Sequence, residues 1–77
     1  MKKGNWSELR VLLRENFKFS FYNNINKWGR TIKVSVSQMG TNEDNFIKFI
    51  NDLGYENVNC RKHVNGPFEY VMIDIKN

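Results

Sequence analysis

The chain has too few cysteines and histidines for a disulfide or an ordinary metal site. Its 77 residues include one cysteine, Cys60, and one histidine, His63. A single cysteine rules out an internal disulfide and fits a reducing compartment such as the cytoplasm. A structural zinc site normally takes about four ligands from cysteine, histidine or carboxylate side chains. We therefore expect neither a bound metal nor a cofactor.

A recognisable catalytic pattern is also missing. Cys60 and His63 could in principle act as a nucleophile and its base, but residues three apart in a strand point to opposite faces and would not meet. The acidic residues after position 50 are too dispersed to suggest a carboxylate pair, and no glycine-rich phosphate loop is present. The sequence therefore predicts a protein that is not an enzyme.

Long hydrophobic runs are absent as well. The first residues, MKKGNWSEL, include two lysines but no apolar run of the kind found in a signal peptide. No stretch approaches the roughly 20 apolar residues that a membrane-spanning helix needs. We therefore expect a soluble, cytoplasmic protein with no membrane partner.

What the chain does have is a modest excess of positive charge and many aromatic residues. Twelve lysines and arginines oppose eight acidic residues, which gives a net charge of +4. This excess favours an anionic partner but also serves solubility, and the sequence leaves both interpretations open. The aromatic residues suit the core of a single domain over residues 1–77, because so short a chain buries only about 60% of its surface.

The clearest element is a helix over residues 41–55. Thr41 can cap it, Glu43 and Asp44 place negative charge in its first turn, and Gly54 favours its end. An apolar face follows at helical spacing, formed by Phe46, Phe49, Ile50 and Leu53. An earlier helix begins at a capping box of Asn5 and Glu8, with its apolar face on Trp6, Leu9, Leu13 and Phe17.

Alternating residues predict four strands. The first covers 17–22 and the second 32–37, and they pair as a hairpin through the loop NNINKWGR. The third covers 58–64, a tight turn follows at Asn65 and Gly66, and the fourth runs over 68–75 after Pro67. Lys62 would share a face with Val58 and Cys60, so the third strand has a polar core position unless it lies at an edge.

The element order predicts an α+β fold of the form αββαββ. The expected architecture is a four-stranded, mainly antiparallel sheet with both helices on one face. An exposed final strand could pair with its twin, so a dimer is possible. The residues expected to face the helices are Phe17, Phe19, Phe21, Ile32, Val34, Val36, Val71, Ile73 and Ile75.

The open face of this sheet is one candidate binding surface. Alternation would display polar residues of the first two strands there, beside Tyr70 and Met72. Cations for phosphates and rings for bases are typical of single-stranded nucleic-acid binders, although an open face has to be polar in any case. The residues expected to bind nucleic acid are Lys18, Tyr22, Lys33 and Arg61.

The loop of the first hairpin is the other candidate. Ile25, Lys27, Trp28 and Arg30 lie in it, and an exposed tryptophan beside arginine is a common anchor of protein interfaces. Trp28 could equally fold back over the end of the core. The sequence leaves these two alternatives open.

The runs FKFSFYNN and TIKVSVSQMGTNEDNFIKFI resemble one of the large polyvalent protein-associated domains of phages and conjugative elements. The matching positions are 18–20, the alternating Ile32, Val34 and Val36, and 40–50, while QMGT stands where the family usually has an aromatic and a GPT-like turn. The resemblance implies a phage or mobile-element accessory protein used against host defences and acting by binding. It brings no catalytic residues.

Two functions therefore follow from the sequence. The first is a non-enzymatic protein that inhibits or modulates a host macromolecule, either a protein or a protein–nucleic acid complex, through the Trp28 loop. The alternative is a nucleic-acid-binding module that uses the open face of the sheet.

Overall fold

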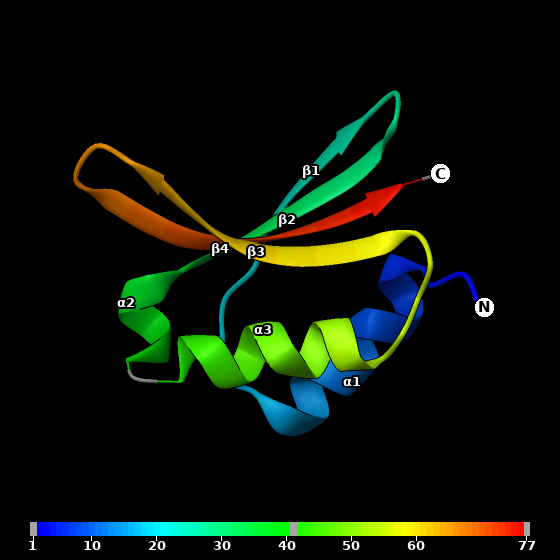
Figure 1. The fold of residues 1–77 in the computed structure, drawn as a ribbon, viewed down its shortest axis with the longest axis horizontal. Helices are drawn as coiled ribbons and strands as arrows, with labels where there is room; N and C mark the ends of the chain where they lie inside the picture. Colours follow the sequence, from blue (N-terminus) through cyan, green and yellow to red (C-terminus); the bar gives the residue numbers. More distant parts are fainter. Residues whose placement is uncertain (1, 41, 77) are drawn as a thin grey trace.

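The computed structural model describes residues 2–40 and 42–76 and forms two layers, a sheet and a layer of helices (Figure 1). The sheet is antiparallel throughout, in the order β1–β2–β4–β3. Helices α1 and α3 lie beneath one face, which confirms the predicted α+β fold. The elements are α1 (Trp6–Asn16), β1 (Tyr22–Asn26), β2 (Gly29–Ser35), α2 (Val36–Met39), α3 (Glu43–Asp52), β3 (Val58–Asn65) and β4 (Phe68–Lys76).

The core lies between these layers and is apolar. Among the described residues no buried side chain is polar or charged. Five of the nine residues predicted to face the helices are buried there, namely Ile32, Val34, Val71, Ile73 and Ile75. The helices complete the core with Leu9 and Leu13 from α1 and Phe46 and Ile50 from α3.

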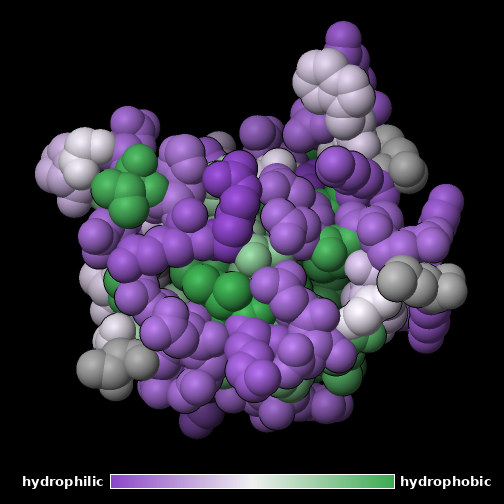
Figure 2. All heavy atoms as spheres, in the orientation of Figure 1, coloured by the Kyte–Doolittle hydropathy of each residue, from purple (hydrophilic) through white to green (hydrophobic). Residues whose placement is uncertain are grey.

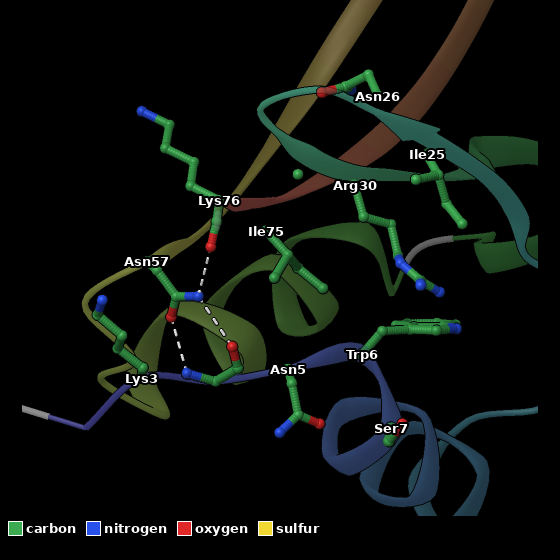
Figure 3. Close-up of a pocket in the computed structure, with 12 residues that line it drawn as sticks. Lys3, Asn5, Trp6, Ser7, Ile25, Asn26, Arg30, Asn57, Ile75 and Lys76 are labelled. Carbon is green, nitrogen blue, oxygen red and sulfur yellow. Dashed lines mark hydrogen bonds between the residues drawn. The ribbon is translucent and has the colours of Figure 1, made fainter.

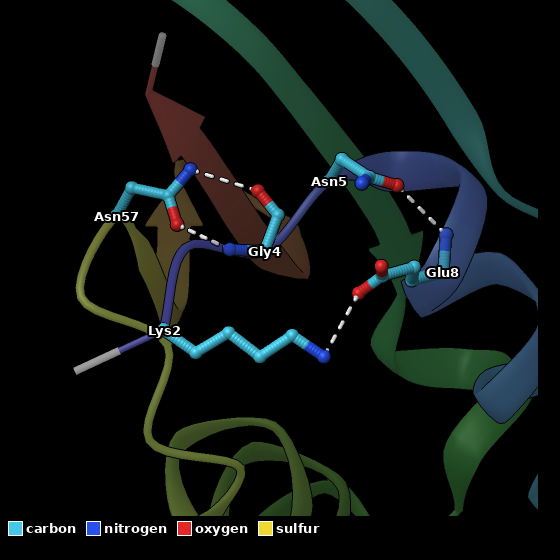
Figure 4. Close-up of polar contacts among 5 residues, drawn as sticks. All are labelled: Lys2, Gly4, Asn5, Glu8 and Asn57. Carbon is cyan, nitrogen blue, oxygen red and sulfur yellow. Dashed lines mark hydrogen bonds and ion pairs between the residues drawn. The ribbon is translucent and has the colours of Figure 1, made fainter.

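Helix α1 starts where the capping box predicts. The Glu8 amide donates to Asn5 Oδ1 over 2.9 Å (Figure 4). The residues before the helix are tied to the sheet layer, because the Asn57 side chain bonds both the N–H and the C=O of Gly4, at 2.7 and 2.9 Å. Lys2 forms an exposed ion pair with Glu8 at 3.7 Å.

Helix α3 also follows its prediction. Phe46 and Ile50 are buried, and Gly54 has a φ of +73°, the left-handed conformation expected at the end of the helix. The predicted cap Thr41 lies outside the described residues. Asn42 occupies the capping position and makes no side-chain capping bond.

The predicted first strand over 17–22 is wrong. Residues 17–21 join the helical layer to the sheet and are not in a strand. The Phe17 and Phe19 rings contact the Phe46 ring edge-on, at centroid distances of 5.0 and 5.6 Å. The Gln38 side chain accepts from the Ser20 N–H and donates to its carbonyl, so a side chain replaces a strand partner.

Most of the predicted loop NNINKWGR is in fact strand. Asn26 pairs with Gly29, so the turn of the first hairpin contains only Lys27 and Trp28. Every residue of β1 is exposed, and an edge strand of this kind shows no hydrophobic period. The second predicted strand ends two residues early, at Ser35, because α2 turns the chain and buries Met39.

The second hairpin confirms most of its prediction. Strand β3 lies at a sheet edge, where Lys62 can reach Glu43 of α3 at 3.1 Å and Glu69 at 3.9 Å. The Glu43 hydrogen bond raises the pKa of Lys62. The turn residues are Gly66 and Pro67, one position later than predicted.

The predicted route to a dimer through the final strand is wrong. Strand β4 pairs with β2 on one side and β3 on the other, so it offers no free edge to a twin. In the described part of the chain no helix has the length and apolar character to cross a membrane.

Asn51 of α3 satisfies the backbone of the edge strand β3. Its side chain accepts from the Cys60 N–H and donates to the Cys60 carbonyl, both over 3.0 Å. We predict that Asn51→Ala lowers the free energy of unfolding by about 1–2 kcal/mol, because two hydrogen bonds are lost. Urea denaturation would measure this, with Asn45→Ala on the exposed side of α3 as the control. Equal stability of the two variants would contradict this role.

Candidate functional site

The open face of the sheet brings together three of the four residues predicted to bind nucleic acid. Tyr22 pairs with Lys33, Lys33 with Met72, and Met72 with Arg61. Facing residues of neighbouring strands project to the same side, so these four side chains form one row across all four strands. A phosphate and a base bound here could meet a cation and a ring within one row.

Aromatic rings line the same depression as Lys33 on this face. Its ammonium lies 5.1 Å from the centre of the Tyr70 ring, which itself contacts the His63 ring at 5.1 Å. Tyr22 is 66% exposed and Phe68 is 68% exposed. These two rings, Lys33 and Tyr70 line a shallow depression of about 420 Å³. We call these four residues the aromatic platform.

The two other predicted cations contribute less to this face. Arg61 lies in the row but its Nε is 3.8 Å from an Asp74 carboxylate oxygen, which offsets part of its charge. Lys18 is not on the sheet. It lies between Phe17 and Phe19, whose rings pack on Phe46 of α3, so it belongs to the helical layer.

The residues predicted to bind a protein partner lie on two different surfaces. Trp28 and Lys27 form the tip of the first hairpin, which stands out from the body in Figure 2. Trp28 is 70% exposed, so the alternative that it covers the core is wrong. Ile25 and Arg30 pair with each other in β1 and β2 and line a hollow next to Trp6 of α1 instead.

The sequence interpretation missed this hollow beside α1. It measures about 510 Å³, and Trp6, Arg30, Lys3 and Lys76 lie around it (Figure 3). A signal was present in the sequence, because Trp6, Arg10 and Arg14 recur every four residues and so share one side of a helix. The opposing residue Arg30 could not be placed without the register of the first hairpin.

Cys60 and His63 lie on opposite faces of β3. Cys60 is 3% exposed among core residues, while His63 lies on the open face against Tyr70. Burial, with a smaller effect of the negative charge on Asp74, raises the pKa of the Cys60 thiol to about 12. Within residues 2–40 and 42–76 no three His, Cys, Asp or Glu side chains gather as a metal site would require.

We predict that the Cys60 thiol is unreactive in the folded protein at pH 8. A thiolate is the reactive species, and the raised pKa keeps the buried thiol protonated. As the pH rises, the thiol ionises in the unfolded chain before it ionises in the folded protein. The stability that the buried, protonated thiol contributes is therefore complete below pH 9.0 and is lost as the pH rises toward 12. A disulfide reagent with and without denaturant would measure reactivity. Equal rates in both would contradict the burial of Cys60.

Comparison with known proteins finds no match among family models, curated proteins or solved structures. The resemblance to a large polyvalent protein-associated domain therefore stays a prediction. Any assignment of function depends on the surfaces described above.

Proposed function

We propose that this protein is a non-enzymatic module that binds single-stranded nucleic acid on the open face of its sheet. The observation that carries the proposal is the aromatic platform, in which three rings line the same depression as Lys33 and one of them, Tyr70, lies against its ammonium. Exposed rings gain nothing for the core, and a sheet face needs only polar residues to meet water. Rings placed beside a cation are the arrangement that single-stranded binders use.

Each part of the platform has a chemical role in this proposal. Tyr22 and Phe68 are the more exposed rings, and they offer flat faces on which unpaired bases stack. Lys33 supplies a positive charge for a phosphate. Its position over Tyr70 holds the ammonium close to the ring face. Stacking tolerates every base, so we expect little sequence preference.

A single strand suits this face better than a duplex. The bases of a duplex are stacked on one another, and their faces are not accessible to protein rings. A duplex would leave Tyr22 and Phe68 with no base to contact and would depend on phosphate contacts alone. The Arg61–Asp74 pair further limits the positive charge that the face could offer to a duplex.

We predict that Tyr22→Ala and Phe68→Ala each weaken binding of single-stranded DNA by about 1–3 kcal/mol, or roughly 5- to 150-fold. Fluorescence anisotropy with a labelled oligothymidylate at low salt would measure this. The control is Val64→Ala, because Val64 is also an exposed apolar residue but projects from the other side of β3. Affinity equal to that of the control in both variants would contradict the platform.

The tip of the first hairpin supports a second candidate function, contact with a protein partner. Trp28 is more exposed than any other large apolar side chain described, and Lys27 Nζ lies 4.5 Å from the centre of its ring. A tryptophan at a projecting tip is a typical interface anchor. This candidate retains the expectation of a phage or mobile-element protein that inhibits a host protein or a protein–nucleic acid complex.

We predict that Trp28→Ala leaves the melting temperature within a few degrees of the wild type, because the ring is mostly outside the core. The same variant should lose any partner that the wild-type protein captures through this tip. Thermal unfolding and paired capture experiments would measure both effects. A large loss of stability would show that Trp28 supports the fold, and unchanged capture would remove the tip as an anchor.

A further inference from the structure

A strongly positive groove lies outside the aromatic platform, between α1 and the first hairpin. One hollow in it is the one shown in Figure 3, where Arg30 extends from β2 toward Trp6, with Lys3 and Lys76 at its other end. A second hollow of about 420 Å³ has Trp6, Arg10 and Arg14 in its lining. Trp6 belongs to both, so we call the two together the α1 groove.

The charge of the α1 groove is of one sign. Its lining includes five cations and, within the described chain, no carboxylate. In the part of the protein that the structure describes, none of the five forms an ion pair. By contrast, Lys48 of α3 and Lys62 of β3 each form an ion pair with an acidic residue. The five are Lys3, Arg10, Arg14, Arg30 and Lys76.

The α1 groove is continuous with the platform. Ser20 and Phe21 line both the hollow that contains Arg10 and Arg14 and the depression on the open face that contains Tyr22 and Lys33. Ser20 and Phe21 therefore form the rim between the two surfaces. A ligand that leaves the platform across this rim arrives at the arginines of α1.

We infer that one strand of nucleic acid runs from the platform across Ser20 and Phe21 into the α1 groove. The inference rests on the proposed function and extends it from one surface to two. Arg10 and Arg14 lie side by side, one turn apart on α1, and both line the second hollow. Their positive charges contact phosphates of the strand there. Arg30 and the half-buried Trp6 receive the next nucleotide of the same strand, a phosphate on the guanidinium and a base on the ring.

The test measures the salt dependence of binding to a short and a long strand. Oligothymidylates of about 5 and about 15 nucleotides span the range of site sizes known for small single-strand binders. The slope of log affinity against log salt counts phosphate contacts, at about 0.7 for each in a single strand. It is unaffected by the larger number of binding positions on a longer strand.

The main variant carries both Arg10→Gln and Arg14→Gln. The single variants Arg10→Gln and Arg14→Gln are each compared with Lys48→Gln, a control that also removes one positive charge but lies outside the α1 groove. We expect the double variant to lower the slope on the long strand by about 1.4 and to leave the short strand unchanged. The control should behave as wild type on both. Equal slopes for wild type and double variant on the long strand would overturn the inference.

Other outcomes separate this inference from the proposed function. If the short strand binds and loses affinity in Tyr22→Ala while the double variant has no effect, the platform is correct and the groove is not part of the site. If the short strand fails to bind and Tyr22→Ala leaves the long strand unaffected, both fail. Competition by polyglutamate as strong as that by an oligothymidylate of equal charge would show that the groove binds an acidic peptide instead.

Discussion

The packing of three phenylalanine rings in the helical layer decides where the first hairpin lies. Phe46 of α3 is fully buried, and the Phe17 and Phe19 rings contact it edge-on. These contacts hold the chain in the helical layer for five residues after α1 ends. Strand β1 therefore begins only at Tyr22, which pairs it with Lys33 and leaves Trp28 at the tip of the hairpin. Both candidate surfaces depend on this register.

Amide side chains also satisfy backbone groups in two segments outside the helices and strands and in the edge strand β3. In each of three places one side chain bonds both the N–H and the C=O of a single residue, as a neighbouring strand would. Neither backbone group is left without a partner, which matters because an unpaired group costs free energy wherever water is excluded. The pairs are Gln38 with Ser20, Asn51 with Cys60, and Asn57 with Gly4.

The sequence predicts elements that have a buried face and fails where none exists. Helix α3 and strand β4 carry clear periods because one side of each is in the core. Strand β1 is exposed at every residue, so its Asn-rich sequence has the pattern of a loop, while the alternation before it has the pattern of a strand. Lys33 and Arg61 follow from alternation in strands that were correctly placed, whereas Lys18 and Tyr22 both depended on the wrong first strand, and Tyr22 lies in the row only because β1 begins there. The α1 groove required a tertiary contact that no local pattern contains.

The exposure of β1 also separates the candidate surfaces from the core. Its side chains face the platform on one side and the α1 groove on the other, and none of them is buried. Changes to Tyr22 or Ile25 therefore remove surface without opening the core. Gly29, at the start of β2, is the opposite case: its φ is +149°, and a Cβ there would overlap the carbonyl oxygen of Ile75. The hairpin is thus fixed to the sheet by a close backbone approach at Gly29, which substitutions of the exposed β1 side chains leave in place.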